Sequence, residues 1–306
     1  GSRSVLGSRQ PYLAEGRIWA SPVKEELISR VSVIIMVELL WESTFDTRAA
    51  IEWARAHADV PIFAVSAYLI IVFYVPAYIG KPWRLRGVWC AWNLFLSCFS
   101  VVGAARTVPH LYNTLQAEGF VYTVCTEPET WYLRGVTGFW VSLFIFSKIP
   151  ELLDTVFLVL QKKEVIFLHW FHHVTVLLYC WHAYTSNTAT GLWFCALNYS
   201  VHAVMYLYYF LSITGGSFRR IARPIAPCIT LVQLIQMVVG SFVTVAAGLM
   251  HSADPNSCSL DPSNFRLGLA MYLSYFFLFS VLFYNLYLKP SGKHAFSKSV
   301  TAGKQL

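Results

Sequence analysis

The sequence predicts an all-α protein that crosses a membrane several times. Hydrophobic residues make up 56% of its 306 residues, charged residues make up only 13%, and the mean hydropathy is positive. A soluble domain carries about 25% charged residues, so this chain has about half the charge that a water-exposed surface needs. The low polarity also argues against intrinsic disorder, and seven cysteines are too few for a disulfide scaffold.

Seven apolar stretches approach the roughly 20 residues that a helix needs to cross the hydrocarbon core of a bilayer. The third and the sixth are the least uniformly apolar of the set. The sequence therefore predicts seven transmembrane helices, at Pro61–Gly80, Val88–Ala105, Gly135–Leu160, Val165–Tyr184, Gly191–Ile213, Pro224–Met250 and Leu267–Leu288.

These spans divide the chain into three predicted regions. Residues 1–57 form an N-terminal segment, residues 58–290 form the seven-helix domain, and residues 291–306 form a tail. Within the first region, Val31–Trp41 is too short to cross the bilayer and is flanked by charge. It is therefore expected to be an interfacial helix.

The basic residues, which give a net charge of +7, collect in alternate loops. Lys and Arg fill the loops after the first, third and fifth spans and the tail, whereas the opposite loops carry mostly Asp and Glu. The positive-inside rule then predicts a cytosolic C-terminus and an N-terminus on the other side. We interpret the charge as this topology signal and expect no nucleic-acid partner.

Two cysteines, Cys125 and Cys258, lie in predicted outer loops, where the compartment permits disulfides. We hypothesise that they form a bridge between these loops. Two unpaired thiols are the alternative, because spacing alone does not prove pairing. The other five cysteines lie in predicted spans and are expected to act as small buried hydrophobes.

The third span carries three charged residues, Lys148, Glu151 and Asp154. Such side chains in a membrane cost several kcal/mol unless they face a partner or a cavity, so each is a candidate site residue. Positions 148, 151 and 155 share a helical face, and Pro150 is expected to kink the helix. A Lys–Glu pair with a purely structural role is the alternative.

The fourth span begins with His169, His172 and His173. Their spacing of three and four residues points all three imidazoles to one side of a helix. Clustered neutral imidazoles are good metal ligands. They also serve as general bases and nucleophiles, and the spacing leaves both chemistries open.

The next two spans add further polar groups at helical spacing. The tyrosines among them are also explained by packing and interface anchoring, and the amides by interhelical hydrogen bonds. Together with the histidines they predict one polar chamber, reached from the cytosolic side, that suits an amphiphile with a charged head and a long tail. The residues are Asn198, His202, Met205, Tyr206 and Tyr209 in the fifth span and Thr230, Gln233 and Gln236 in the sixth.

At these residues the sequence resembles the very-long-chain fatty acid elongases, the condensing enzymes of the endoplasmic reticulum. The resemblance covers about residues 60–290, and its flanks at the histidines are most similar to the subgroup that elongates saturated and monounsaturated chains. Gln161 departs from the pattern, because the family often has Arg there. Four signatures occur in order: Lys148-x-x-Glu151-Leu-x-Asp154-Thr155, His169-x-x-His172-His173, Asn198-x-x-x-His202-x-x-Met205-Tyr206-x-Tyr208-Tyr209 and Thr230-x-x-Gln233-x-x-Gln236.

The resemblance implies a 3-ketoacyl-CoA synthase in the endoplasmic reticulum membrane. Acyl-CoA and malonyl-CoA condense to a 3-oxoacyl-CoA two carbons longer, and carbon dioxide and CoA leave. The family fold is seven helices, six of which form a barrel around a substrate tunnel. No bound cofactor or metal is expected, and the expected partners are the two CoA thioesters, membrane lipid, a second copy in a homodimer and other enzymes of the elongation cycle.

The residues suggest roles in this reaction. No cysteine lies within the signatures, so we expect His172 to form an acyl-imidazole, as the resemblance also implies, with His202 as acid and base. His169 and His173 would orient His172 or donate to an oxyanion, and Asp154 would hold an imidazole tautomer. Substrate binding is expected from Lys148, Glu151, Asn198, Tyr206, Tyr209, Gln233 and Gln236.

Two other classes of protein compete with this interpretation. Membrane di-iron desaturases and hydroxylases also use H-x-x-H-H boxes, but they need several of them, and this chain has one. A non-enzymatic seven-helix receptor or transporter would fit the span count. It would not need Lys, Glu and Asp beside clustered histidines.

Overall fold

The computed structural model describes residue 1 and residues 42–289. The chain divides into two compact units after Trp41, and every helix below belongs to the unit Glu42–Leu306. The predicted interfacial helix at Val31–Trp41 and the predicted tail at 291–306 lie outside the described residues. Within residues 42–289 the regular elements are all helical and there is no strand, so the all-α fold class is confirmed.

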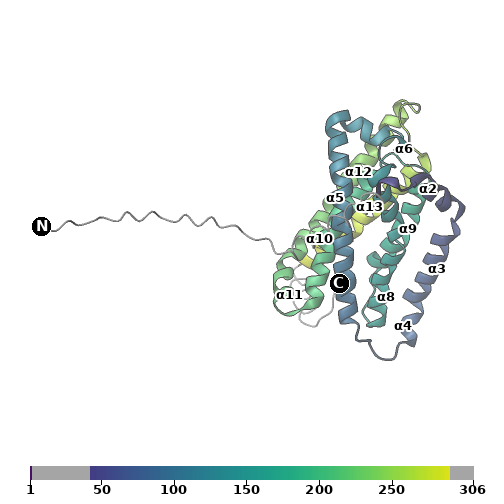
Figure 1. Cartoon of the computed structure of the whole chain (residues 1–306). Helices are drawn as coiled ribbons and strands as arrows, with labels where there is room; N and C mark the ends of the chain where they lie inside the picture. Colours follow the sequence, from purple (N-terminus) through teal and green to yellow (C-terminus); the bar gives the residue numbers. More distant parts are fainter. Residues whose placement is uncertain (2–41, 290–306) are drawn as a thin grey trace. The chain divides into compact units, whose positions relative to one another are not determined.

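Each predicted span falls on helix in the structure. Figure 1 places α6 at one end of the bundle and α4, α8 and α11 at the other, and we call these the α6 end and the α11 end. The helices are α2 (Thr47–Ala56), α3 (Asp59–Phe73), α4 (Val75–Tyr78), α5 (Arg86–Cys125), α6 (Pro128–Trp131), α7 (Gly135–Ser147), α8 (Leu153–Leu160), α9 (Phe167–Thr185), α10 (Gly191–Thr214), α11 (Gly216–Ala222), α12 (Ala226–Ala253) and α13 (Pro262–Phe283).

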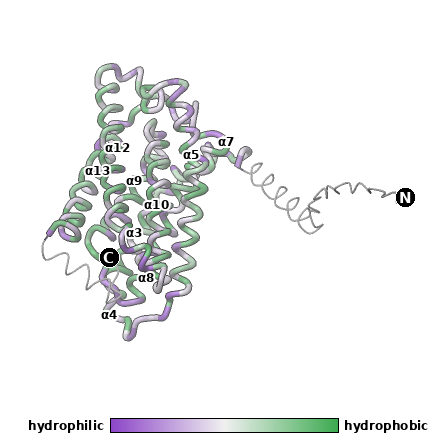
Figure 2. The backbone as a smooth tube through the Cα atoms, turned by 90° about the vertical axis from the view of Figure 1, so that its left-hand side faces the viewer, coloured by the Kyte–Doolittle hydropathy of each residue, from purple (hydrophilic) through white to green (hydrophobic). Residues whose placement is uncertain are grey.

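Among residues 42–289, three helical stretches are long and apolar enough to cross a membrane: Arg86–Cys125, Gly216–Ala253 and Pro262–Leu288. A fourth is added if α2 and α3, which meet at an angle of 63°, count as one span. Figure 2 shows hydrophobic residues recurring along the long helices, with hydrophilic residues at the loop beside α4. The membrane character is therefore confirmed, while the seven-span barrel stays a prediction.

Helix α5 runs 20 residues beyond the predicted span that ended at Ala105. Arg106, the first residue beyond the predicted span, lies inside the helix, and its guanidinium pairs with Glu42 at 3.1 Å. The Glu42 carboxylate also accepts a hydrogen bond from the indole of Trp140 at 3.0 Å. A charge that finds a partner does not end a helix, so α5 continues past Arg106. It is kinked at Gly119, whose φ is 82°, before it ends at Cys125.

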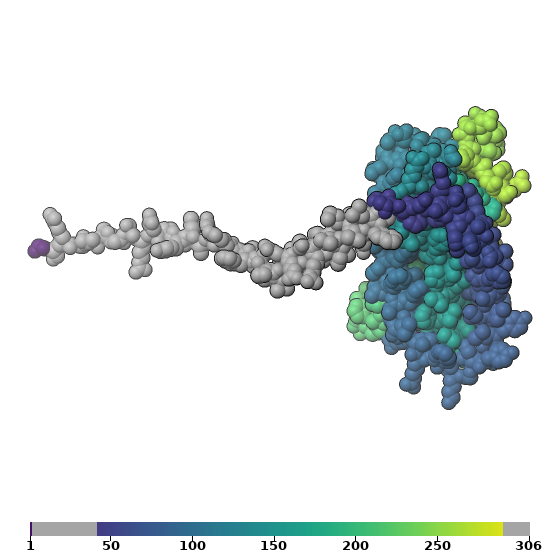
Figure 3. All heavy atoms as spheres, turned by 45° about the vertical axis from the view of Figure 1, so that its right-hand side comes forward, coloured from purple at the N-terminus to yellow at the C-terminus, as the bar shows by residue number. Residues whose placement is uncertain are grey.

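Helix α2 lies in the segment for which the sequence predicted only an interfacial helix. Asp46 caps it by accepting a hydrogen bond from the amide of Ala49. Ile51 and Ala54 are fully buried against α7 and α9, and the Trp181 indole donates to the Ala54 carbonyl at 3.0 Å. Figure 3 shows this part of the chain lying across one face of the bundle.

The third predicted span is not one continuous helix. It consists of α7, a 3-10 turn at Pro150–Leu152 and α8. Pro150 has no backbone N–H to continue α7, which explains the break at the predicted kink. Lys148 and Glu151 lie at this break and pair directly, with Nζ 2.8 Å from Oε1.

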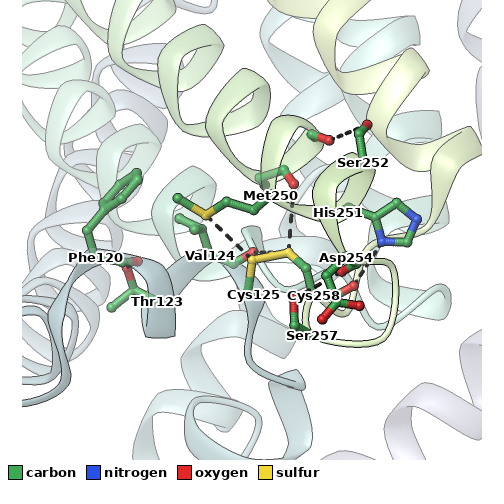
Figure 4. Close-up of a disulfide and its surroundings, with 12 residues drawn as sticks. Phe120, Thr123, Val124, Cys125, Met250, His251, Ser252, Asp254, Ser257 and Cys258 are labelled. Atoms are coloured by element: carbon green, nitrogen blue, oxygen red, sulfur yellow. Dashed lines mark hydrogen bonds between the residues drawn. A yellow bond between two sulfur atoms is a disulfide. The ribbon is translucent and has the colours of Figure 1, made fainter.

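A disulfide joins Cys125, at the end of α5, to Cys258 in the loop before α13 (Figure 4). The Ser259 amide also donates to the Cys125 carbonyl at 2.7 Å. Both contacts lie beside α6. They tie two loops, 133 residues apart in sequence, at this end of the bundle.

Candidate active site

A cavity of about 230 Å³ opens toward the α11 end, with walls from α5, α8, α9, α10, α12 and α13. We call it the wide cavity. The predicted gathering of polar groups from several helices in one chamber is therefore present. The predicted site residues that line it are His169, His172, His173, His202, Asp154, Tyr206, Tyr209 and Gln233.

The three imidazoles of α9 lie in its first two turns and touch one another. The ring centroids of His169 and His173 are 4.6 Å apart, and those of His172 and His173 are 5.5 Å apart. His169 Nε2 is hydrogen-bonded to Thr155 Oγ1 at 2.8 Å, and Thr155 is bonded in turn to the hydroxyl of Tyr68. Helical spacing thus delivers all three side chains to one wall, as predicted.

His202 enters the same cavity from α10. Its Nε2 lies 3.2 Å from Asn198 Nδ2, and its ring centroid is 5.4 Å from that of Tyr206 one turn further on. The histidines of α9 and His202 therefore approach a bound molecule from two different helices. A reacting group in the cavity can meet imidazoles on two sides.

Asp154 does not hold an imidazole, which corrects the predicted role. Its Oδ1 accepts a hydrogen bond from the Trp92 indole at 2.7 Å, and its Oδ2 accepts one from the Tyr206 hydroxyl at 2.8 Å. Both oxygens are thus engaged by residues of α5 and α10. The carboxylate fixes Tyr206 in the cavity wall and does not form the third member of a triad.

Four predicted substrate-binding residues do not line the wide cavity: Lys148, Glu151, Asn198 and Gln236. All four are buried, with at most 5% of each residue exposed. The structural Lys–Glu pair, considered above as the alternative, is present and reaches the site only through Asn198. On α12, Gln233 does line the cavity, and its amide donates to the Met205 sulfur at 3.4 Å.

Three residues that sequence reasoning missed belong to this site. Trp92 bonds to Asp154, Tyr68 bonds to Thr155, and the Tyr275 ring lies 5.0 Å from that of His172. The Tyr275 hydroxyl also donates to the His172 carbonyl at 3.2 Å. Each carries a polar atom on a mostly apolar helix, and that need for a partner was the available signal.

Basic groups lie at the α11 end of the wide cavity. Arg219 and Arg223 line it together with Glu164. Lys163, in the loop between α8 and α9, places its ammonium 4.2 Å from the ring centroid of Trp89. Burial, and secondly the charge of Arg219, lowers the pKa of this ammonium to about 8.

The histidines do not form a metal centre of recognisable geometry. Within residues 42–289, no three or more His, Cys, Asp or Glu side chains are grouped so that they could hold a metal ion. The hydrogen bonds described above show instead imidazoles whose partners are Thr155 and Asn198. This arrangement suits proton transfer and nucleophilic attack at the cavity wall.

Comparison with known proteins identifies the family of this chain. The family model described as the ELO: GNS1/SUR4 family matches residues 53–295. The chain belongs to this family. Fatty acid elongase 3 of Trypanosoma brucei brucei is 46% identical over 267 residues, which cover 79% of this chain and 88% of that protein. The resemblance to the elongases is therefore confirmed.

Two further relatives extend the comparison. Very long chain fatty acid elongase 4 of Trypanosoma cruzi is 46% identical over 242 residues, covering 77% of this chain and 84% of its own. Very long chain fatty acid elongase 6 of Drosophila melanogaster is 39% identical over 255 residues, covering 82% and 79%. Membership of this family favours the elongase interpretation over a desaturase, a receptor or a transporter.

Proposed function

We propose that the protein is a fatty acid elongase that condenses an acyl-CoA with malonyl-CoA. The products are a 3-oxoacyl-CoA two carbons longer, carbon dioxide and CoA. The observation that carries the proposal is the meeting of four imidazoles, from α9 and α10, in one cavity of about 230 Å³. Membership of the ELO family supports it.

In the first half-reaction, a ring nitrogen of His172 attacks the thioester carbonyl of the acyl-CoA. The new N–C bond makes an acyl-imidazole, and the C–S bond breaks to release CoA. Neutral imidazoles are nucleophiles at neutral pH, and His172 has the His173 ring beside it in the cavity wall. His202 faces the same space and hydrogen-bonds to the leaving sulfur, which takes up the proton that the attacking His172 ring gives up.

In the second half-reaction, malonyl-CoA loses carbon dioxide and its enolate carbon attacks the acyl-imidazole. A C–C bond forms, the N–C bond breaks, and a proton from solvent restores the neutral ring of His172. Negative charge develops on the carbonyl oxygens during both steps. N–H donors in the wall, from the imidazoles and Gln233, stabilise that charge.

The charges favour one direction for the bound substrate. The phosphates of CoA lie at the α11 end, where Arg219 and Arg223 line the wide cavity. The acyl chain then points toward the α6 end. A second cavity of about 30 Å³, which we call the narrow cavity, lies in that direction between Cys180, Cys195, Gly240 and Tyr272. Each methylene that is buried along this path stabilises binding by about 0.8 kcal/mol.

The proposal includes the setting of the enzyme. We place it in the endoplasmic reticulum membrane, with the C-terminus cytosolic and the N-terminus lumenal, because the basic loops lie at the α11 end and the disulfide lies at the α6 end. All seven predicted spans are helical, which supports the barrel. A homodimer and contact with other elongation enzymes complete the proposal.

The test is to incubate the purified protein with acyl-CoA alone and map the adduct by mass spectrometry. We expect the acyl group on His172. We also expect His172→Ala to lower carbon dioxide release from malonyl-CoA by roughly 10³-fold or more. His182→Ala is the matched control, because His182 is on the same helix but bonds to Asn264 and does not line the wide cavity. An acyl group on a cysteine would contradict the proposal.

A further inference from the structure

Four buried polar side chains form a continuous chain from the α7–α8 break to the wide cavity. Lys148 is 2%, Glu151 4%, Asn198 5% and His202 8% exposed. The Lys148 ammonium lies 2.8 and 3.0 Å from the two oxygens of Glu151 and 3.5 Å from Asn198 Oδ1. Asn198 Nδ2 lies 3.2 Å from His202 Nε2. Of the four, only His202 lines the cavity.

The ammonium decides which way the Asn198 amide points. A lysine ammonium has three hydrogens to donate and no lone pair, so it attracts an oxygen and repels an N–H group. Amide orientation is assigned from such neighbours. With its oxygen toward Lys148, the amide must present its NH₂ group to His202.

The Asn198 amide in turn decides which nitrogen of His202 carries the proton. An NH₂ group donates, so His202 Nε2 must accept with its lone pair and cannot be protonated. The proton of the neutral ring is therefore on Nδ1. We propose that Lys148, acting through Asn198, holds His202 as the Nδ1–H tautomer, so that His202 serves the reaction as a hydrogen-bond donor.

This assignment deepens the proposed function and rests on it. The same ring cannot also take up a proton at Nε2 without losing its bond to Asn198, so the nucleophile and the base come from α9. His202 donates from Nδ1 to an oxygen or thiolate on which charge develops. Lys148 and Asn198 are thus positioning residues.

The proposal gives the buried Lys148–Glu151 pair a role other than stabilising the fold. A buried Lys–Glu pair gains little net stability, because desolvation offsets most of its attraction. Glu151 holds the ammonium in place through both of its oxygens, and it also accepts a hydrogen bond from Ser147 at 2.7 Å. The orientation of the Asn198 amide is what the pair supplies.

The decisive variant is Asn198→Asp, which keeps the shape of the side chain but can only accept. A carboxylate requires a proton on His202 Nε2, so the tautomer should switch. We expect ¹⁵N spectra of histidine-labelled protein, with the His202 signals assigned by their loss in His202→Gln, to show this switch. We also expect kcat to fall by about 10²-fold while KM for acyl-CoA changes less than twofold.

The chain offers a matched control in a second Asn–His pair, of which Asn264 is buried. Asn264 Nδ2 lies 3.0 Å from His182 Nδ1, and neither residue lines the wide cavity. Asn264→Asp should therefore switch the proton of His182 and leave kcat unchanged. The double variant Lys148→Met, Glu151→Gln removes the charge that orients Asn198, and it should give His202 a mixture of both tautomers.

The outcomes separate this proposal from the proposed function. A wild-type spectrum with the proton on His202 Nε2 would overturn the tautomer assignment, whatever the enzyme's activity. A switched tautomer in Asn198→Asp with unchanged kcat would overturn the donor role. Absence of condensation by the wild-type protein would instead refute the proposed function, because the spectra need no substrate.

Discussion

The wide and the narrow cavity share four helices, α9, α10, α12 and α13, and differ in almost every other respect. The wide cavity measures about 230 Å³ and the narrow cavity about 30 Å³. On each of these helices, one residue that lines the wide cavity lies seven positions, or about 10 Å along the helix axis, from one that lines the narrow cavity. The pairs are His173 and Cys180 on α9, His202 and Cys195 on α10, Gln233 and Gly240 on α12, and Phe279 and Tyr272 on α13.

Two turns of helix thus separate a reactive space from a packed one. The polar groups of the wide cavity bond to one another, whereas the wall of the narrow cavity holds two buried atoms without a partner among the described residues, Asn187 Oδ1 and Thr188 Oγ1. A space of this size holds one or two water molecules, which could satisfy both atoms. The proposed function therefore predicts that the narrow cavity limits the length of the acyl chain, while the reacting carbonyl lies in the wide cavity.

The largest expected effect concerns the disulfide at the α6 end. Replacing both disulfide cysteines, Cys125→Ser with Cys258→Ser, should lower the free energy of unfolding by about 2–5 kcal/mol, because the bridge closes a long loop. Thermal unfolding in detergent measures the loss. Replacing the exposed free cysteines, Cys98→Ser with Cys228→Ser, is the matched control.

The same double variant also tests the separation of the two ends. At 25 °C the remaining folded enzyme should keep kcat within about twofold, since neither sulfur lies near the imidazoles. A large loss of kcat without a loss of stability would show that the α6 end takes part in the chemistry.

The next effect concerns the narrow cavity itself. A methyl group at Gly240 would overlap the ring of Tyr272, and both residues line this cavity. Gly240→Ala should lower the free energy of unfolding by about 1–3 kcal/mol and shorten the longest product, because the ring is displaced into the cavity. Product chain lengths from a panel of acyl-CoAs measure the second effect.

An equally tight glycine provides the control for this variant. A methyl group at Gly103 would overlap the ring of Tyr199, but neither residue lines either cavity. Gly103→Ala should destabilise the protein to a similar degree and leave the product lengths unchanged. Equal product lengths from both variants would mean that the acyl chain does not reach the narrow cavity.

The features that could be predicted from the sequence are those that depend on residues close together along the chain. The histidines of α9 and the Lys148–Glu151 pair depend on spacings of three or four residues, which helix geometry determines. The same holds for the break at Pro150. Within one helix, the spacing in sequence fixes which side chains are neighbours. The histidines that line the wide cavity, and the ion pair behind it, could therefore be named from the sequence.

The errors arise where partners lie far apart in sequence. Asp154 was assigned an imidazole partner, but its carboxylate bonds to Trp92, 62 residues away. The predicted second span ended before Arg106, whose partner, Glu42, lies 64 residues earlier in the sequence. Which helices become neighbours depends on packing of the whole bundle, and no local pattern reports it.

The smallest expected effect concerns the charge of Lys163 at the α11 end of the bundle. The lowered pKa of Lys163, about 8, means that its ammonium is charged below that pH and neutral above it. Its attraction for CoA phosphates at the α11 end is therefore present at pH 7 and lost by pH 9. KM for acyl-CoA should rise about twofold to fivefold over this range, the size expected for a half-exposed ion pair.

Lys163→Arg separates this titration from others in the site, because a guanidinium stays charged at pH 9. The rise in KM should disappear in this variant, whereas Lys81→Arg, at an exposed position away from both cavities, should keep it. If Lys163→Arg shows the same rise as the wild type, the phosphates do not lie beside Lys163. Arg219 and Arg223 would then have to bind them alone, and charge would distinguish the two ends of the bundle less than cavity size does.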